Sequence, residues 1–65
     1  MGSVNVERKL VALRQRLVDF QRGLLLQAAD AETMPTHNAL RQIADLESAI
    51  IATETMIEEQ REQPE

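Results

Sequence analysis

Apolar residues in the first half of the chain recur in alternating steps of four and three positions. This spacing places them on one face of an α-helix. Ser3 or Asn5 is suited to cap its first turn, where Glu7 is also favourable. The pattern predicts a helix over about residues 5–31, whose apolar face contains Val6, Leu10, Leu13, Leu17, Phe20 and Leu24.

A second helix is predicted after a break at Pro35, which disfavours helical geometry at the preceding Met34. Thr33 or Thr36 can cap this helix, and Pro35 would fit its first turn if Thr33 is the cap. We expect a turn over about 32–36, a helix over about 37–60 and a polar, frayed tail over 61–65. The same four-and-three spacing continues through Ala39, Ile43, Leu46, Ile50, Thr53 and Ile57.

A turn this short joins antiparallel neighbours, so the sequence predicts a single all-α helical hairpin over residues 1–65. The register that follows places Leu24 opposite Ile43 and Leu10 opposite Ile57. The expected intrachain core consists of Leu10, Leu13, Leu17, Phe20, Leu24, Ile43, Leu46, Ile50 and Ile57.

The charge distribution supports the antiparallel pairing. Residues 1–31 carry five cations and three acids, whereas residues 32–65 carry two cations and eight acids, and the whole chain has a net charge of −4. In the predicted hairpin Arg14 lies near Glu54 and Arg22 near Asp45. Exposed ion pairs contribute only about 0–1 kcal/mol each, so charge selects this arrangement more than it stabilises it.

The apolar surface is wider than the narrow seam that two packed helices need. The first helix has a second apolar column at seven-residue spacing, and the second helix has further apolar residues beside its seam. We therefore expect the hairpin to dimerise into a four-helix bundle, although a helical protein partner would cover the same surface and the dimer orientation stays open. The residues expected to mediate self-association are Val4, Val11, Val18, Leu25, Ile51 and Met56.

The size of the chain favours the same conclusion. A protein of 65 residues buries too little surface to be very stable alone, and small folds are usually reinforced by disulfides, metals or oligomerisation. The sequence has no Cys and a single His37, which excludes disulfides and disfavours a zinc site. Oligomerisation is therefore the remaining way to stabilise a chain of this size.

No motif for catalysis or cofactor binding is found. Glu54 and Glu58 share a helix face, but the Glu-x-x-His element of diiron bundles is absent. No Ser or Thr has a neighbouring base, and two Gly residues cannot form a phosphate-binding loop. We expect no catalytic, metal or cofactor site, and therefore not an enzyme.

Membrane and secretion signals are also not found. No apolar run approaches the roughly 20 residues of a membrane span, and Val6 stands where a myristoylation motif requires Ser or Thr. We expect a cytoplasmic protein. Whether residues 1–3 are native stays open.

Three functions fit this architecture. The leading one is a non-enzymatic protein–protein interaction or adaptor module that self-associates by helix packing. A hairpin dimer is also the architecture of plasmid copy-control RNA-binding proteins, and the first helix is basic. The net charge of −4 and the single aromatic residue disfavour nucleic-acid binding, because phosphate contacts need cations and base stacking needs aromatics.

The segment Leu46-Glu47-Ser48-Ala49-Ile50 resembles the second helix of the short hairpin co-chaperones that hold needle subunits in bacterial type III secretion. The resemblance covers five residues, together with the chain length and the helix–turn–helix organisation. It implies a groove that holds an aggregation-prone helical partner.

Overall fold

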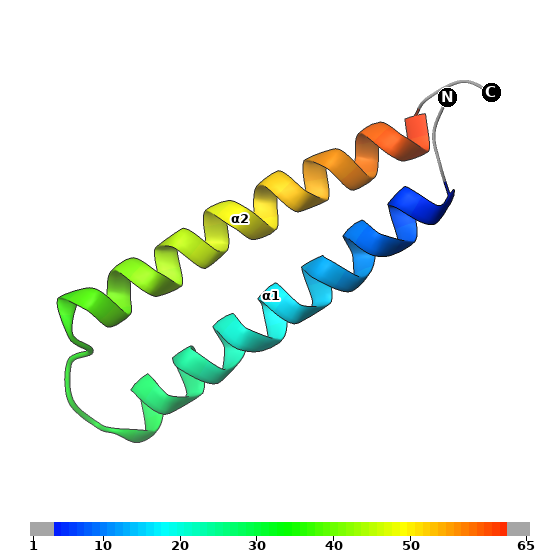
Figure 1. The fold of residues 1–65 in the computed structure, drawn as a ribbon. Coiled ribbons are helices and arrows are strands. Elements are labelled where there is room, and N and C mark those ends of the chain that lie inside the picture. Colours follow the sequence, from blue (N-terminus) through cyan, green and yellow to red (C-terminus); the bar gives the residue numbers. More distant parts are fainter. Residues whose placement is uncertain (1–3, 63–65) are drawn as a thin grey trace.

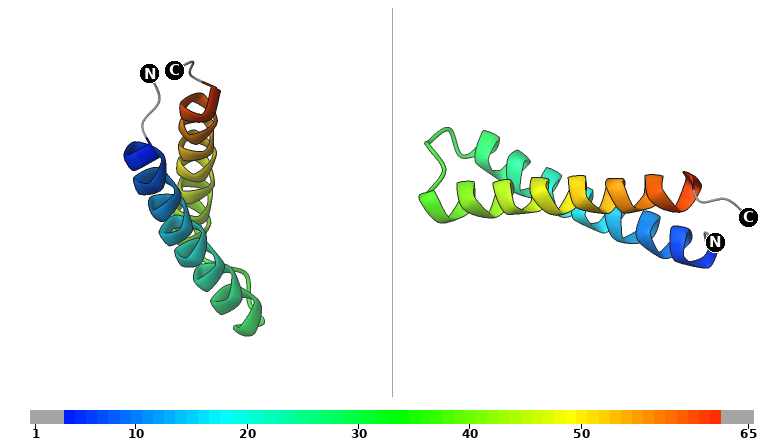
Figure 2. Two further views of the ribbon diagram at one scale, coloured as in Figure 1. Left: turned by 90° about the vertical axis from the view of Figure 1, so that its right-hand side faces the viewer. Right: turned by 90° about the horizontal axis from the view of Figure 1, so that it is seen from above.

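The computed structural model is a hairpin of two antiparallel helices, and it describes residues 4–62 (Figure 1). Helix α1 spans Val4–Asp30 and helix α2 spans His37–Glu62. The views in Figure 2 show the helices side by side along their lengths, crossing obliquely. The all-α hairpin predicted from the sequence is confirmed.

The helix bounds differ from those expected by one or two residues. Helix α1 begins and ends one residue earlier, and α2 continues through Arg61 and Glu62, which the sequence assigned to a frayed tail. The remainder of that tail, residues 63–65, lies outside the described residues.

The turn is defined by one left-handed residue and one helix cap. Glu32 has a φ of 60°, which directs the chain away from α1 directly after the Ala31 N–H donates to the Gln27 carbonyl at 3.1 Å. Thr36 caps α2, because its Oγ1 accepts from the backbone N–H of Ala39 at 3.1 Å. Pro35 therefore precedes the cap rather than occupying the first turn of α2.

Helix α2 faces α1 with the ridge that its sequence pattern indicated. Ile50, Thr53 and Ile57 are buried, and Ile43 and Leu46 are half-buried. Thr53 is accommodated among apolar residues because its hydroxyl donates to the Ala49 carbonyl at 2.7 Å. The polar group at the centre of the seam is thereby satisfied within its own helix.

Helix α1 faces α2 with a different set of residues from the one expected. Leu10, Leu17 and Leu24 are half-buried, as are Val11 and Val18, which the sequence analysis assigned to self-association. Leu13 and Phe20, expected in the core, are 37% and 52% exposed. The prediction was wrong for these two residues.

The rotation of α1 has a physical reason. Glu7, Arg14 and Gln21 lie between the leucine and valine columns, and all three are half-buried. By turning this polar column toward α2, the helix covers apolar columns on both sides of it. A turn that buried Leu13 and Phe20 would expose Val11 and Val18 instead, since one partner helix covers only part of the apolar arc.

Polar contacts across the seam give the register. Gln21 Nε2 donates to the Ile43 carbonyl at 3.3 Å and to Glu47 Oε1 at 2.9 Å. Arg61 Nε pairs with Glu7 Oε2 at 3.0 Å. These contacts have the offset that the sequence predicted for Leu24 opposite Ile43 and Leu10 opposite Ile57.

The ion pairs are not those expected. Within residues 4–62 the structure has one ion pair, Glu7–Arg61, in which α1 supplies the acid and α2 the base. Neither Arg14–Glu54 nor Arg22–Asp45 forms. Because the side chains of Glu7 and Arg61 are 31% and 53% exposed, the pair contributes little stability and mainly marks the register.

The turn yields the first testable prediction. Replacing Glu32 with Gly should stabilise the protein by about 0.5–1 kcal/mol, because Gly adopts the left-handed conformation without the steric cost that a Cβ imposes. Urea unfolding at a fixed protein concentration measures the gain. Glu32→Ala is the control: it removes the same charge and keeps the Cβ, so an equal gain in both variants would contradict this explanation.

Candidate protein-interaction surface

The hairpin has two broad faces, one on each side of the seam, and the seam contacts show which residues belong to each. Gln21 and Glu7 reach Glu47 and Arg61 on one side. Residues seven positions apart lie above one another on a helix, and we call such a row a column. When two helices pack antiparallel, the columns beside the seam on both helices together form the two faces of the pair. The columns on the side away from Glu47 and Arg61 begin at Leu10 and Val6 in α1 and at Ala39 and Gln42 in α2.

We call this side the uncharged face, because none of its columns contains a charged residue. It holds the exposed side chains of Leu13 and Phe20 from α1, together with Met56 from α2, which is 48% exposed. Its full membership is Leu10, Leu17, Leu24, Val6, Leu13, Phe20 and Gln27 of α1, and Ala39, Leu46, Thr53, Gln60, Gln42, Ala49 and Met56 of α2.

The opposite side, the mixed face, interleaves apolar and charged residues. Val4, Leu25 and Ile51 are exposed there, and so is Leu40. Charged residues interrupt this apolar set, namely Glu47, Glu54, Glu58 and Arg61 of α2 and Arg8 and Arg22 of α1. Burial of this face would remove several charges from water, which is costly unless each is paired.

The structure divides the six residues expected to mediate self-association. Val11 and Val18 are half-buried in the intrachain seam. Val4, Leu25 and Ile51 lie on the mixed face, whereas Met56 lies on the uncharged face. The six therefore do not form one continuous surface, and the exposed residues that best complete such a surface with Met56 are Leu13 and Phe20.

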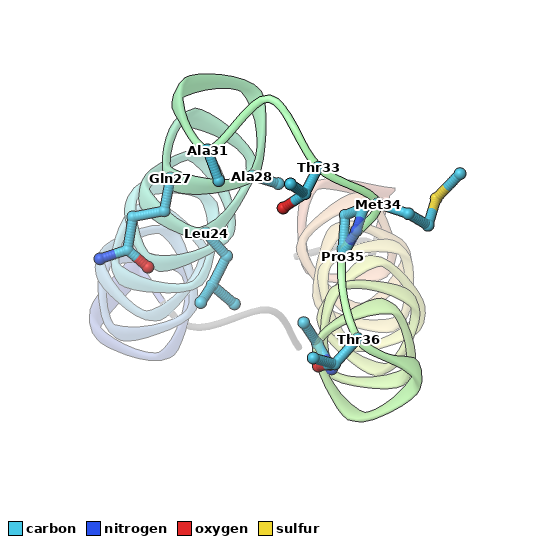
Figure 3. A pocket seen from close by; sticks show the side chains of 9 residues that line it. Leu24, Gln27, Ala28, Ala31, Thr33, Met34, Pro35 and Thr36 are labelled. Atoms are coloured by element: carbon cyan, nitrogen blue, oxygen red, sulfur yellow. The ribbon is translucent and has the colours of Figure 1, made fainter.

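Two hollows extend along α1 toward the turn. The larger, about 260 Å³, lies where the helices diverge, and Figure 3 shows Leu24 pointing into this space while Met34 points away from it. The smaller, about 180 Å³, lies beside Phe20 and Gly23 and shares Leu24 and Gln27 with the larger. A Cβ on Gly23 would meet nothing within 4 Å, so within the chain no other helix approaches this glycine closely.

Charges of opposite sign border the uncharged face. The next column of α1 contains Lys9 and Arg16 and, at the last residue of the helix, Asp30, and the next column of α2 contains Asp45 and Glu59; all five are exposed. The face therefore has a basic edge along the first half of α1 and an acidic edge along α2.

The hairpin leaves an unusually large surface in water. Its accessible surface is 5143 Å², about 1,000 Å² more than the roughly 4,200 Å² of a compact protein of this mass. The radius of gyration is 15.1 Å, compared with about 11 Å for a compact chain of this length. The excess is comparable to the roughly 800 Å² that each partner contributes to a stable interface.

Comparisons with known proteins give no relative: no family model, curated protein or solved structure matches this chain. Among residues 4–62, no three His, Asp or Glu side chains come together in a metal-binding arrangement. Neither α1 nor α2 is long and apolar enough to cross a membrane. The candidate site thus rests on the geometry of the uncharged face.

Sequence reasoning missed that Leu13 and Phe20 belong to a surface. The available signal was the column Glu7-Arg14-Gln21, whose polar members lie between two apolar columns. A polar column in the middle of an apolar arc indicates that the partner helix faces this column and covers the apolar columns beside it, which leaves the outermost apolar column for a second partner. The charge-free columns then indicate which side is left for the second partner.

Proposed function

We propose that this protein is a protein–protein interaction module without catalytic activity, and that it self-associates through the uncharged face to form a four-helix bundle of two hairpins. The uncharged face is the observation that carries the proposal. It combines exposed Leu13, Phe20 and Met56 with adjoining columns that contain no charge. Such a surface favours burial against another apolar surface.

The exposed apolar side chains of the uncharged face supply a large part of the free energy that dimerisation needs. Complete burial of a large apolar side chain contributes about 1.5–3 kcal/mol, so burial of the exposed half contributes about 1 kcal/mol. Val6, Leu13, Phe20 and Met56 from two copies together supply about 8 kcal/mol, before the leucines beside the seam and the cost of association are counted. Association itself costs about 4–15 kcal/mol, so the half-buried leucines beside the seam must supply the remaining free energy of dimerisation.

A second copy is the partner that this face fits best. An interface related by a two-fold axis brings the same patch of each chain together, so the patch must complement itself. A face without charges meets this requirement because it cannot repel its own copy. The opposite charges at its two edges allow each edge to meet the other edge of a second copy.

Dimerisation predicts a mass and a melting temperature that depend on concentration. Light scattering should give twice the 7.3 kDa chain mass at tens of micromolar, and the melting temperature should rise with protein concentration because association stabilises the folded state. A chain mass of one hairpin up to millimolar concentration, with constant melting temperature, would refute self-association.

The choice of face is tested by paired charge substitutions. Leu13→Glu with Phe20→Glu should weaken dimerisation at least 100-fold, because four carboxylates would be buried without partners. Leu25→Glu with Ile51→Glu is the matched control, since these residues are similarly exposed, at 48% and 54%, on the mixed face. Sedimentation at several concentrations measures both, and circular dichroism reports helicity.

The results for the two double variants identify the face that forms the dimer interface. A dimer lost in the first variant and retained in the control supports the uncharged face. Loss in the control alone would assign the interface to the mixed face. The milder pair Leu13→Ala and Phe20→Ala guards against a loss of folding, and it should weaken the dimer while keeping the chain helical.

A further inference from the structure

We propose that the two hairpins pair with their turns at the same end of the bundle, so that α1 of each copy covers α2 of the other. This inference rests on the proposed dimer and adds its orientation. Packing two copies by the uncharged face allows two arrangements with a two-fold axis. In one, the turns lie together and α1 meets the partner's α2; in the other, the turns lie at opposite ends and each helix meets its own copy.

The charged edges distinguish these arrangements. The contacts Glu7–Arg61 and Gln21–Glu47 give the levels of the two helices, and they place Lys9 at about the level of Glu59. Arg16 lies between the levels of Asp45 and Glu59. With the turns together, the basic edge of each α1 runs beside the acidic edge of the partner's α2.

The opposite orientation brings like charges together. Each α1 would run antiparallel to its own copy, which brings the two Arg16 side chains, near the middle of the helix, beside each other and removes Lys9 from the acidic edge of α2. Each α2 edge, with Asp45 and Glu59, would likewise meet another acidic edge. Exposed pairs are individually weak, but the two arrangements bury nearly the same residues, so the sign of these contacts decides between them.

Side-chain size favours the same orientation. Along the uncharged face, Leu13 lies near the level of Met56 and Phe20 near that of Ala49. With the turns together, the large Phe20 of one copy packs over the small Ala49 of the other, and Gln27 lies near the level of Gln42. With the turns apart, the large α1 column packs on its own copy, and the α2 column of Gln42, Ala49 and Met56 packs on its own copy.

Distances between spin labels test this orientation directly. The sequence contains no Cys, so a single label introduced as Met34→Cys at the exposed turn is unique to each chain. Turns at the same end give a label separation of about 15–30 Å, set by the spacing of packed helices and the label linkers. Turns at opposite ends separate the labels by roughly the 51 Å length of the hairpin.

A label at the other end, introduced as Glu62→Cys, is the matched control and should give a similarly short separation. Short distances in both samples support the proposal. Long distances in both would overturn the orientation and leave the dimer intact. A monomer mass with no dipolar coupling would overturn the dimer itself, so the two failures are distinguishable.

Charge reversal gives an independent test of the edges. Lys9→Glu with Arg16→Glu should weaken the dimer on the order of tenfold at low salt, since it places two acidic edges together. Adding Asp45→Lys and Glu59→Lys to the same chain should restore the affinity. With the turns apart, the first pair only replaces a basic self-contact by an acidic one, so an unchanged dissociation constant would contradict the proposal.

Discussion

The structure depends on one constraint: the apolar arc of α1 is wider than a single α2 can cover. Two helices in contact share a narrow seam, whereas α1 presents columns beginning at Val4, Leu10 and Val6 with only the column of Glu7, Arg14 and Gln21 between them. Whichever way α1 turns, one apolar column faces solvent. The hairpin places the column of Leu13 and Phe20 outside.

The polar column explains why this choice is the stable one. Gln21 at the centre of the seam is satisfied by the Ile43 carbonyl and by Glu47, and Glu7 is satisfied by Arg61. A half-buried polar side chain without a hydrogen-bond partner costs free energy, whereas each hydrogen bond that forms contributes about 0.5–1.5 kcal/mol to stability. By facing its polar column toward α2, the helix satisfies those groups and retains the valines and leucines on either side of them.

Hydrophobic periodicity predicted the helices, the turn and the antiparallel register, because these depend on spacing along one chain. It also identified the α2 ridge, in which Ile50 and Ile57 are buried. It failed for Leu13 and Phe20 because several rotations of α1 satisfy the same spacing equally well. The rotation is decided by contacts between Gln21, Glu7 and the other helix, which periodicity of apolar residues does not register.

The charge distribution acts at two levels of the structure. Within the chain, the basic first half and the acidic second half favour packing of the two helices against each other, although the expected ion pairs Arg14–Glu54 and Arg22–Asp45 do not form. The charges are left instead on outward columns, where Lys9, Arg16, Asp45 and Glu59 edge the uncharged face. Charges that stay in water at an edge keep their hydration and still discriminate between orientations of a partner. On a surface that is apolar in the middle and charged at its edges, burial of the apolar centre thus provides the affinity for a partner. The charged edges select the orientation in which that partner binds.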